Sequence, residues 1–140
     1  MDLPYVIDKV IELGGKVNDM STDFPPIICA AMHGSLKATS RLIKKGADVN
    51  LCGLWGKRTA LDLAVARSDE KLTRILLEAD ANKKWASYYV ESHNQNESIA
   101  NALLDHGAEV SKDSGYLKGI ESKRKASLER LRPRKRPHTE

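Results

Sequence analysis

Short apolar runs at helical spacing alternate along the chain with breaks at glycine, asparagine or aspartate. Apolar residues that recur every three or four positions fall on one face of a helix, so such runs predict amphipathic helices. The clearest stretch, residues 25–50, predicts two short helices back to back, with a break at Gly34 and an end at Gly46. Glycine suits that end because helices commonly terminate in a left-handed residue. The two apolar faces consist of Ile27, Ile28, Ala30 and Ala31, and then of Ala38, Leu42 and Ile43.

The same order of features recurs along the chain. A second copy covers residues 59–82, and a third covers residues 86–108. An apolar run over residues 3–13 precedes them and predicts the second helix of a copy whose first helix is absent. Repetition at a period of 20–50 residues is typical of solenoids and arrays. The pattern therefore indicates a repeat protein.

The repeating unit resembles the ankyrin repeat, which opens on T-P-L-H-x-A and has a period near 33 residues. Pro25, Pro26 and Ile27 stand at the opening of the first complete copy. The close of that copy, residues 46–50 with the sequence GADVN, is the most specific match. The resemblance implies an all-α solenoid of stacked helix-turn-helix pairs with short inter-repeat turns.

The resemblance also divides the chain into two parts. Residues 1–116 form the expected ankyrin-repeat domain, and residues 117–140 the expected basic, flexible C-terminal tail, in which residues 117–131 are expected to be transiently helical. Within the domain, a half repeat serves as the N-terminal cap and three repeats follow. Their expected bounds are 1–24 for the half repeat and about 25–58, 59–85 and 86–113 for the repeats.

The last repeat is irregular. The complete copies start at residues 25, 59 and 86, so the spacing drops from 34 to 27 residues and leaves the third loop no room for a projecting turn. Trp85, in that shortened loop, is expected to pack between the last two repeats. Glu91 and Ser92 replace the small alanine pair of the pattern, which fits a C-terminal cap whose outer face meets water.

Charge is distributed unevenly. The formal net charge is +4. Residues 118–140 hold nine Lys and Arg against three Glu, a net +6, which leaves the preceding 117 residues at −2. No apolar run reaches the roughly 18–20 residues of a membrane span, and the N-terminus does not read as a signal peptide. We therefore expect an intracellular protein without a membrane partner.

The candidate chemistry is sparse. Cys29 and His33 are four positions apart on a predicted helix, a spacing that suits two metal ligands, but a structural zinc site needs four and no matching second pair occurs. Neither Cys29 nor Cys52 lies in a recognisable nucleophile motif, and no phosphate-binding glycine loop is present. The sequence predicts no enzyme, no metal and no cofactor.

The resemblance implies that the chain binds an unidentified protein partner, as an adaptor or as an inhibitor. Partners of such repeats contact the concave groove and the turn tips. Trp55 is the most suggestive residue, because tryptophan and arginine are enriched at binding hot spots; the alternative is that its ring folds back over the neighbouring turn. The candidate partner-binding residues are Met32, His33 and Arg67 in the groove, and Leu54, Trp55 and Arg58 in the turn.

The basic tail admits three interpretations. Its two clusters resemble a nuclear localisation signal, which implies an import receptor as partner and a nuclear or nucleo-cytoplasmic location. A second interpretation is contact with nucleic-acid phosphates, weakened by salt and without aromatic stacking; a third is a solvated tail without dedicated function. Ser127 follows a basic run and resembles a kinase substrate. The cluster residues are Lys123, Arg124 and Lys125, and then Arg132, Arg134, Lys135 and Arg136.

Overall fold

The structure is a computed structural model that describes residues 3–53, 55–92 and 95–134. In these residues the chain forms eight α-helices and one isolated antiparallel bridge, between Gly53 and Arg58. The expected all-α repeat solenoid is confirmed. The helices are α1 (Leu3–Glu12), α2 (Pro26–Met32), α3 (Leu36–Lys44), α4 (Ala60–Ala66), α5 (Glu70–Glu78), α6 (Lys84–Ser92), α7 (Glu97–Asp105) and α8 (Tyr116–Leu131).

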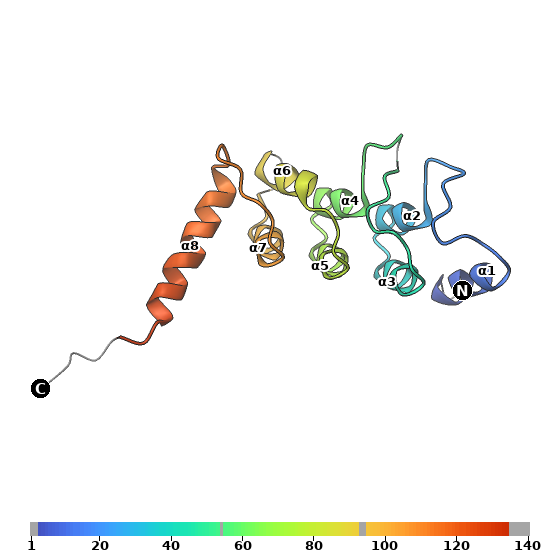
Figure 1. Cartoon of the computed structure of the whole chain (residues 1–140), viewed down its shortest axis with the longest axis horizontal. Helices are drawn as coiled ribbons and strands as arrows, with labels where there is room; N and C mark the ends of the chain where they lie inside the picture. The colour runs from blue at the N-terminus through green and yellow to red at the C-terminus, as the bar shows by residue number, and fades with distance from the viewer. Residues whose placement is uncertain (1–2, 54, 93–94, 135–140) are drawn as a thin grey trace, which may run out of the picture.

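The helices form two layers (Figure 1). An inner layer holds α2, α4 and α6, and an outer layer holds α1, α3, α5 and α7, each helix packing on the next in its own layer. The apolar core lies between the layers and is built from Ile, Leu, Val and Ala side chains. Buried Thr39 and Thr73 donate their hydroxyl protons to the carbonyls of Ser35 and Asp69, four residues earlier.

Side-chain caps explain where the helices begin. Ser35, Thr59, Asp69 and Asn96 each accept a hydrogen bond from the backbone N–H three residues later, which satisfies a donor that the first turn leaves free. The backbone has positive φ just past α1, α2, α3, α4, α5 and α7, the left-handed conformation that the sequence predicts at Gly46. After α5 this residue is Asp80 with φ 61°, whereas α3 and α7, its neighbours in the outer layer, are followed by Gly46 and Gly107.

Hydrogen bonds between successive turns hold the repeats in register. The N–H of Asp48 donates to Asn18 Oδ1 at 2.8 Å, and the N–H of Asn82 donates to Asn50 Oδ1 at 2.7 Å. Helix α1 is attached by charge as well, because Arg41 of α3 forms a forked pair with Asp8. That pair lowers the pKa of the Asp8 carboxyl.

The last repeat has a different register from the expected one. Helix α6 begins at Lys84, and its buried positions are Ala86, Ser87 and Val90, so its buried face is shifted from the one that the pattern predicts. Trp85 was expected to be packed but is 62% exposed, and this prediction is wrong. The physical reason is that the helix starts two residues after Asn82, which places Trp85 in the first turn on the outward face.

The C-terminal segment also differs from the expected flexible tail. Residues 116–131 form helix α8, which crosses the end of the array and packs against α7 (Figure 1). Leu117 and Ile120 are buried there. Because these two side chains cover apolar surface that the last repeat would otherwise expose, the basic composition of the segment does not keep it unfolded.

Candidate protein-binding surface

A short hairpin projects from the array between α3 and α4. The N–H of Gly53 donates to Arg58 O at 2.8 Å, and the N–H of Arg58 donates back to Gly53 O at 3.2 Å. We call residues 53–58 the 53–58 hairpin. Its base is tightly packed, because a Cβ on Gly53 would lie 2.8 Å from Ile28 Cγ2. The hairpin is therefore anchored to the first complete repeat.

Trp55 stands at the tip of this hairpin. Its side chain is 75% exposed, so it does not fold back over the neighbouring turn. Its backbone has φ 60°, a conformation in which tryptophan is an outlier and which the anchored ends of the hairpin impose. Leu54, predicted beside it, lies outside the described residues. The tip thus presents a large apolar ring to solvent.

Arg58 closes the hairpin and also contacts α6, the inner helix of the last repeat. Its guanidinium carbon lies 5.4 Å from the centroid of the Tyr89 ring of α6. Such a cation–π contact holds the base of the hairpin against α6. Arg58 is half-buried as a result, so its predicted role in partner binding is combined with a structural one.

The other predicted groove residues gather at the opposite ends of the inner helices. Arg67 Nη1 donates to the carbonyl of Met32 at 2.8 Å, which joins the ends of α4 and α2. His33 is exposed beside them, with Nδ1 2.8 Å from Cys29 O. Helix α4 has seven residues, so about 10 Å of helix separates this group from the hairpin. The structure thus divides the predicted surface into two groups.

An exposed aromatic pair, which sequence reasoning missed, lies on α6. Trp85 and Tyr88 are 62% and 60% exposed, and their rings meet edge to face with centroids 6.4 Å apart. Lys84 Nζ lies 5.8 Å from the Trp85 ring centroid. The available signal was their spacing of three on a helix whose buried face is Ala86, Ser87 and Val90.

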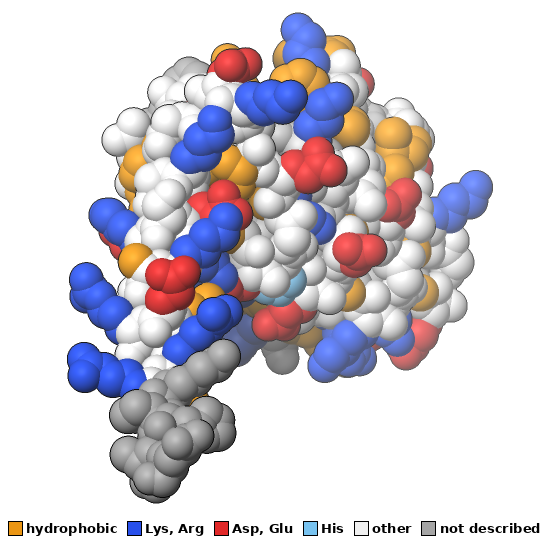
Figure 2. All heavy atoms as spheres, turned by 60° about the vertical axis from the view of Figure 1, so that its left-hand side comes forward, with side chains coloured by type: hydrophobic (Ala, Val, Ile, Leu, Met, Phe, Trp, Pro, Cys, Tyr) orange, Lys and Arg blue, Asp and Glu red, His pale blue; other side chains and the backbone are white. Residues whose placement is uncertain are grey.

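The predicted basic clusters are not one free segment. Arg124 of α8 donates to the carbonyl of Asn101 at 3.0 Å and pairs with Asp105, both on α7. Lys125 Nζ lies 3.5 Å from Glu121 one turn earlier. Lys123, Ser127, Arg132 and Arg134 are exposed, whereas Lys135 and Arg136 lie outside the described residues. Figure 2 shows Lys and Arg side chains along this end of the molecule.

In the part of the chain that the structure describes, the two cysteines do not form a metal site with histidines. Cys29 Sγ faces the carbonyl of Phe24 at 3.4 Å, and the structure leaves both cysteines as free thiols. Within residues 3–53, 55–92 and 95–134, no group of three or more His, Cys, Asp or Glu side chains is arranged to hold a metal ion. Over the same residues, no helix combines the length and the apolar character needed to cross a bilayer.

Comparisons with known proteins give the family. A family model for ankyrin repeats in three copies matches residues 5–87. An ankyrin repeat-containing protein of Treponema pallidum (strain Nichols) is 37% identical over 76 residues, which are 53% of this chain and 25% of that relative. The chain thus spans about a quarter of the relative it matches. No solved structure matches the chain significantly.

The family has a general role. Ankyrin repeats mediate protein–protein interaction. The family model covers α1 to α5 and the beginning of α6, and the two-layer array continues beyond it through α7. Because the model matches more than half of the chain, this protein belongs to the ankyrin-repeat family.

Proposed function

We propose that the chain is a protein-binding adaptor that contacts its partner through the 53–58 hairpin and the exposed face of α6. The observation that carries the proposal is the exposure of two tryptophans, Trp55 at 75% and Trp85 at 62%. Large aromatic rings are costly to leave in water and are enriched at interface hot spots. Arg58 links the two elements through Tyr89 and so holds the surface in one arrangement.

The groove group adds a second contact region. Met32 and His33 are exposed at the end of α2, and Arg67 is exposed beside them. Met32 suits an apolar partner of adaptable shape, because its thioether side chain is flexible. A partner that spans α4 would reach both regions. A partner bound to both regions is joined to this chain, and its own contact surface is covered at the same time. An inhibitor would therefore act through the same contact as an adaptor.

The C-terminal basic residues are the basis for proposing a nuclear or nucleo-cytoplasmic location. Arg132 and Arg134 follow the end of α8 and are exposed, and Lys135 and Arg136 continue the run in sequence. We place the import signal in this second cluster, because Arg124 of the first cluster is bonded to α7. The competing function is binding of nucleic-acid phosphates by the exposed cations of α8, with the repeats recruiting a protein.

Capture from cell lysate at about 50 and about 300 mM salt tests the proposal, since phosphate contacts weaken strongly over that range. The baits are the full chain, Trp55→Ala, Trp85→Ala and the matched control Tyr5→Ala, which removes an exposed ring from α1. Truncation of a hot-spot residue costs about 2 kcal/mol or more of binding free energy. Each tryptophan variant should therefore bind the partner with an affinity about 30-fold lower.

Two outcomes would contradict the adaptor. One is a partner retained equally by both tryptophan variants. The other is capture limited to nucleic acid that disappears at the higher salt concentration.

A further inference from the structure

The turn-to-turn hydrogen bonds that join the repeats stop before the last turn. Asn18 bonds the next turn through Asp48, and Asn50 bonds the next turn through Asn82. Asn82 Oδ1 instead accepts the N–H of Lys84 in its own turn, at 3.0 Å. Among the described residues, no hydrogen bond joins residues 80–84 to residues 107–111.

A groove opens where this connection is missing. It has a volume of about 860 Å³, and we call it the interturn groove. The turn at residues 80–84 forms one wall and residues 107–111 form the other, with α6 and the start of α8 beneath. Its lining includes Asn82, Ser87, Tyr88, Glu91, Glu109 and Leu117.

Two features of the sequence leave this space open. Asn50 and Leu61 are eleven positions apart, whereas Asn82 and the equivalent buried residue Ser87 are only five apart, so the third loop lacks six residues. Ser87 is also much smaller than Leu61, which fills the same position of α4 completely. The loop that would project over the groove and the side chain that would fill its floor are both reduced.

The floor of the interturn groove holds an unsatisfied polar group. Ser87 is only 8% exposed, and its Oγ has no hydrogen-bond partner. Buried Thr39 and Thr73 bond to carbonyls, and the hydroxyl of Ser114 donates to Glu91. Buried hydroxyls without partners are uncommon because the desolvated group loses its bonds to water. Ser87 is one of the residues that line the groove, so this unpartnered hydroxyl belongs to a side chain at the edge of a space that a ligand can enter.

The charges around the interturn groove indicate a neutral ligand. Asp80, Glu91 and Glu109 stand against Lys83 and Lys84, so the lining has no excess of cations for a phosphate. Lys83 Nζ lies 3.9 Å from Asp80 Oδ1. The Glu91 carboxylate already accepts bonds from Ser114, Tyr116 and Leu117. Neutral backbone amides fit this lining better than an anion.

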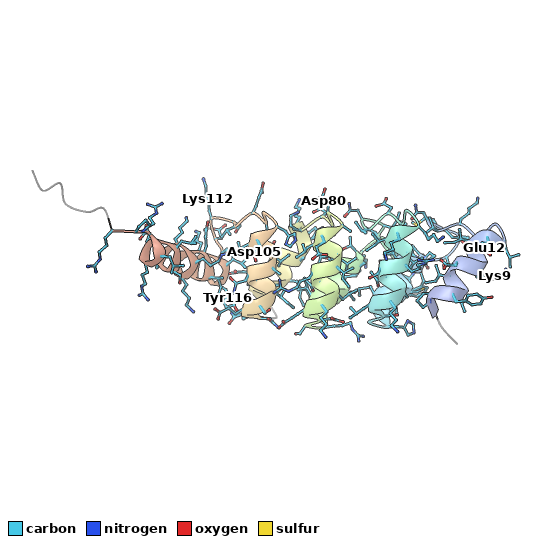
Figure 3. The ribbon with its side chains drawn as sticks, turned by 90° about the horizontal axis from the view of Figure 1, so that it is seen from below. Lys9, Glu12, Asp80, Asp105, Lys112 and Tyr116 are labelled. Carbon is cyan, nitrogen blue, oxygen red and sulfur yellow. The ribbon has the colours of Figure 1, made fainter. Side chains whose placement is uncertain are left out.

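We propose that the interturn groove binds an extended segment of a partner polypeptide, which lies between the two turns and replaces the missing connection. A strand added beside existing backbone gains affinity from main-chain hydrogen bonds and specificity from alternate side chains. Every second side chain of the segment points to the floor, which Ala81, Ser87 and Leu117 line. Asp80 and Lys112 project from the same edge of the array, so both turns open to one side (Figure 3).

The groove shares α6 with the surface of the proposed function but does not include Trp55. A random peptide library displayed on phage tests it. The full chain is the target, and Ser87→Leu, which fills the floor, is the counter-selection. A selected peptide is then synthesised and its affinity measured by fluorescence anisotropy. Ser87→Leu should weaken binding about tenfold or more, because the larger side chain occupies the space in the floor that the peptide would enter. Trp55→Ala should bind the peptide as the parent does.

A scan of N-methylated peptides tests the strand-like docking. Methylation removes one N–H donor at a time, so the affinity loss should recur at every second position of the peptide. Tyr88→Ala removes a wall side chain that is 60% exposed, and it should weaken binding even if Ser87→Leu folds poorly. Its unfolding transition serves as the folding control.

Three results would overturn the proposal. They are the absence of any peptide enriched over Ser87→Leu, N-methyl losses without alternation, and displacement of the peptide by duplex DNA or inorganic phosphate. Because Trp55→Ala leaves the groove intact, failure of the adaptor surface and failure of the groove give different patterns.

Discussion

Glu91 attaches the C-terminal helix to the repeats. Its carboxylate accepts hydrogen bonds from Ser114 Oγ at 2.7 Å, Tyr116 N at 2.8 Å and Leu117 N at 2.9 Å. Helix α8 has no side-chain cap of its own at Gly115, so a residue of α6 satisfies its first free amides. Partial burial raises the pKa of Glu91, but the hydrogen bonds from Leu117, Tyr116 and Ser114 outweigh it, and the pKa is lowered overall.

The lowered pKa of Glu91 predicts that the attachment of α8 weakens in acid. A carboxyl whose pKa is lower in the folded state contributes stability above its unfolded pKa and loses it as pH falls through the folded pKa. The amide resonances of Tyr116 and Leu117 should therefore shift as pH falls below the ordinary value of 4.5, with α8 losing protection from exchange. Glu91→Gln should weaken the attachment at neutral pH and remove this pH dependence. An unchanged titration in Glu91→Gln would contradict the assignment.

Some surface residues could be recognised from sequence, and their contacts could not. Trp55 is flanked by a glycine-rich turn, and its exposure agrees with a turn tip. The bond from Arg67 to Met32 and the stacking of Arg58 on Tyr89 depend on how two repeats are rotated against each other. The sequence pattern within one repeat does not show how that repeat is rotated against its neighbour. Partner binding by these residues stays a prediction.

At the scale of elements, α8 combines a docked half and a free half. Leu117, Ile120, Arg124, Leu128 and Leu131 fall on one stripe of the helix, since their spacing is three or four residues. Leu117 and Ile120 are buried, and Arg124 is bonded to α7, whereas Leu128 and Leu131 are exposed. The first half of α8 therefore stabilises the whole helix.

The sequence predicted only a transient helix over residues 117–131, because the local signals for α8 are weak. Gly115 is a poor helix start without a side-chain cap, and basic residues dominate the segment. Its order depends on a neighbour, because α7 provides the surface that Leu117 and Ile120 cover. The helix pairs of the repeats were predictable because each has its own apolar face, a glycine or polar break, and a polar cap on its second helix.

Two double variants separate the halves of α8. Leu117→Ala with Ile120→Ala removes the buried contacts of α8. Each substitution should lower the free energy that stabilises the docked helix by about 2–5 kcal/mol. The 16-residue helix would then stand alone at a length that is marginal in water, so most of its circular-dichroism signal should disappear. Leu128→Ala with Leu131→Ala should leave that signal nearly unchanged, because both side chains are exposed. Equal losses in the two variants would show that α8 is not held by its first half.

At the scale of the whole molecule, the array is a row in which the main contacts of each described helix are with its neighbours. Helix α5 lies in the middle and packs against α3, α4 and α7, whereas α1 packs against α3 at one end. The repeat period revealed this row from sequence, since equal spacing of turns implies equal stacking. The third repeat departs from it because a loop shorter by six residues changes the register of α6, which the period alone does not show.

Stacking in a row predicts that position along the array decides how far a defect spreads. Leu76→Ala in α5 leaves a cavity at a fully buried site between both layers, so the free energy of global unfolding should fall by about 2–5 kcal/mol. Amide exchange should then accelerate in helices on both sides of α5. Ile7→Ala in α1 removes a partly buried side chain at the end of the row, and its effect should be confined to α1 and the facing side of α3. Hydrogen exchange by mass spectrometry distinguishes the two patterns, and a global acceleration in Ile7→Ala would show instead that the array unfolds as one unit.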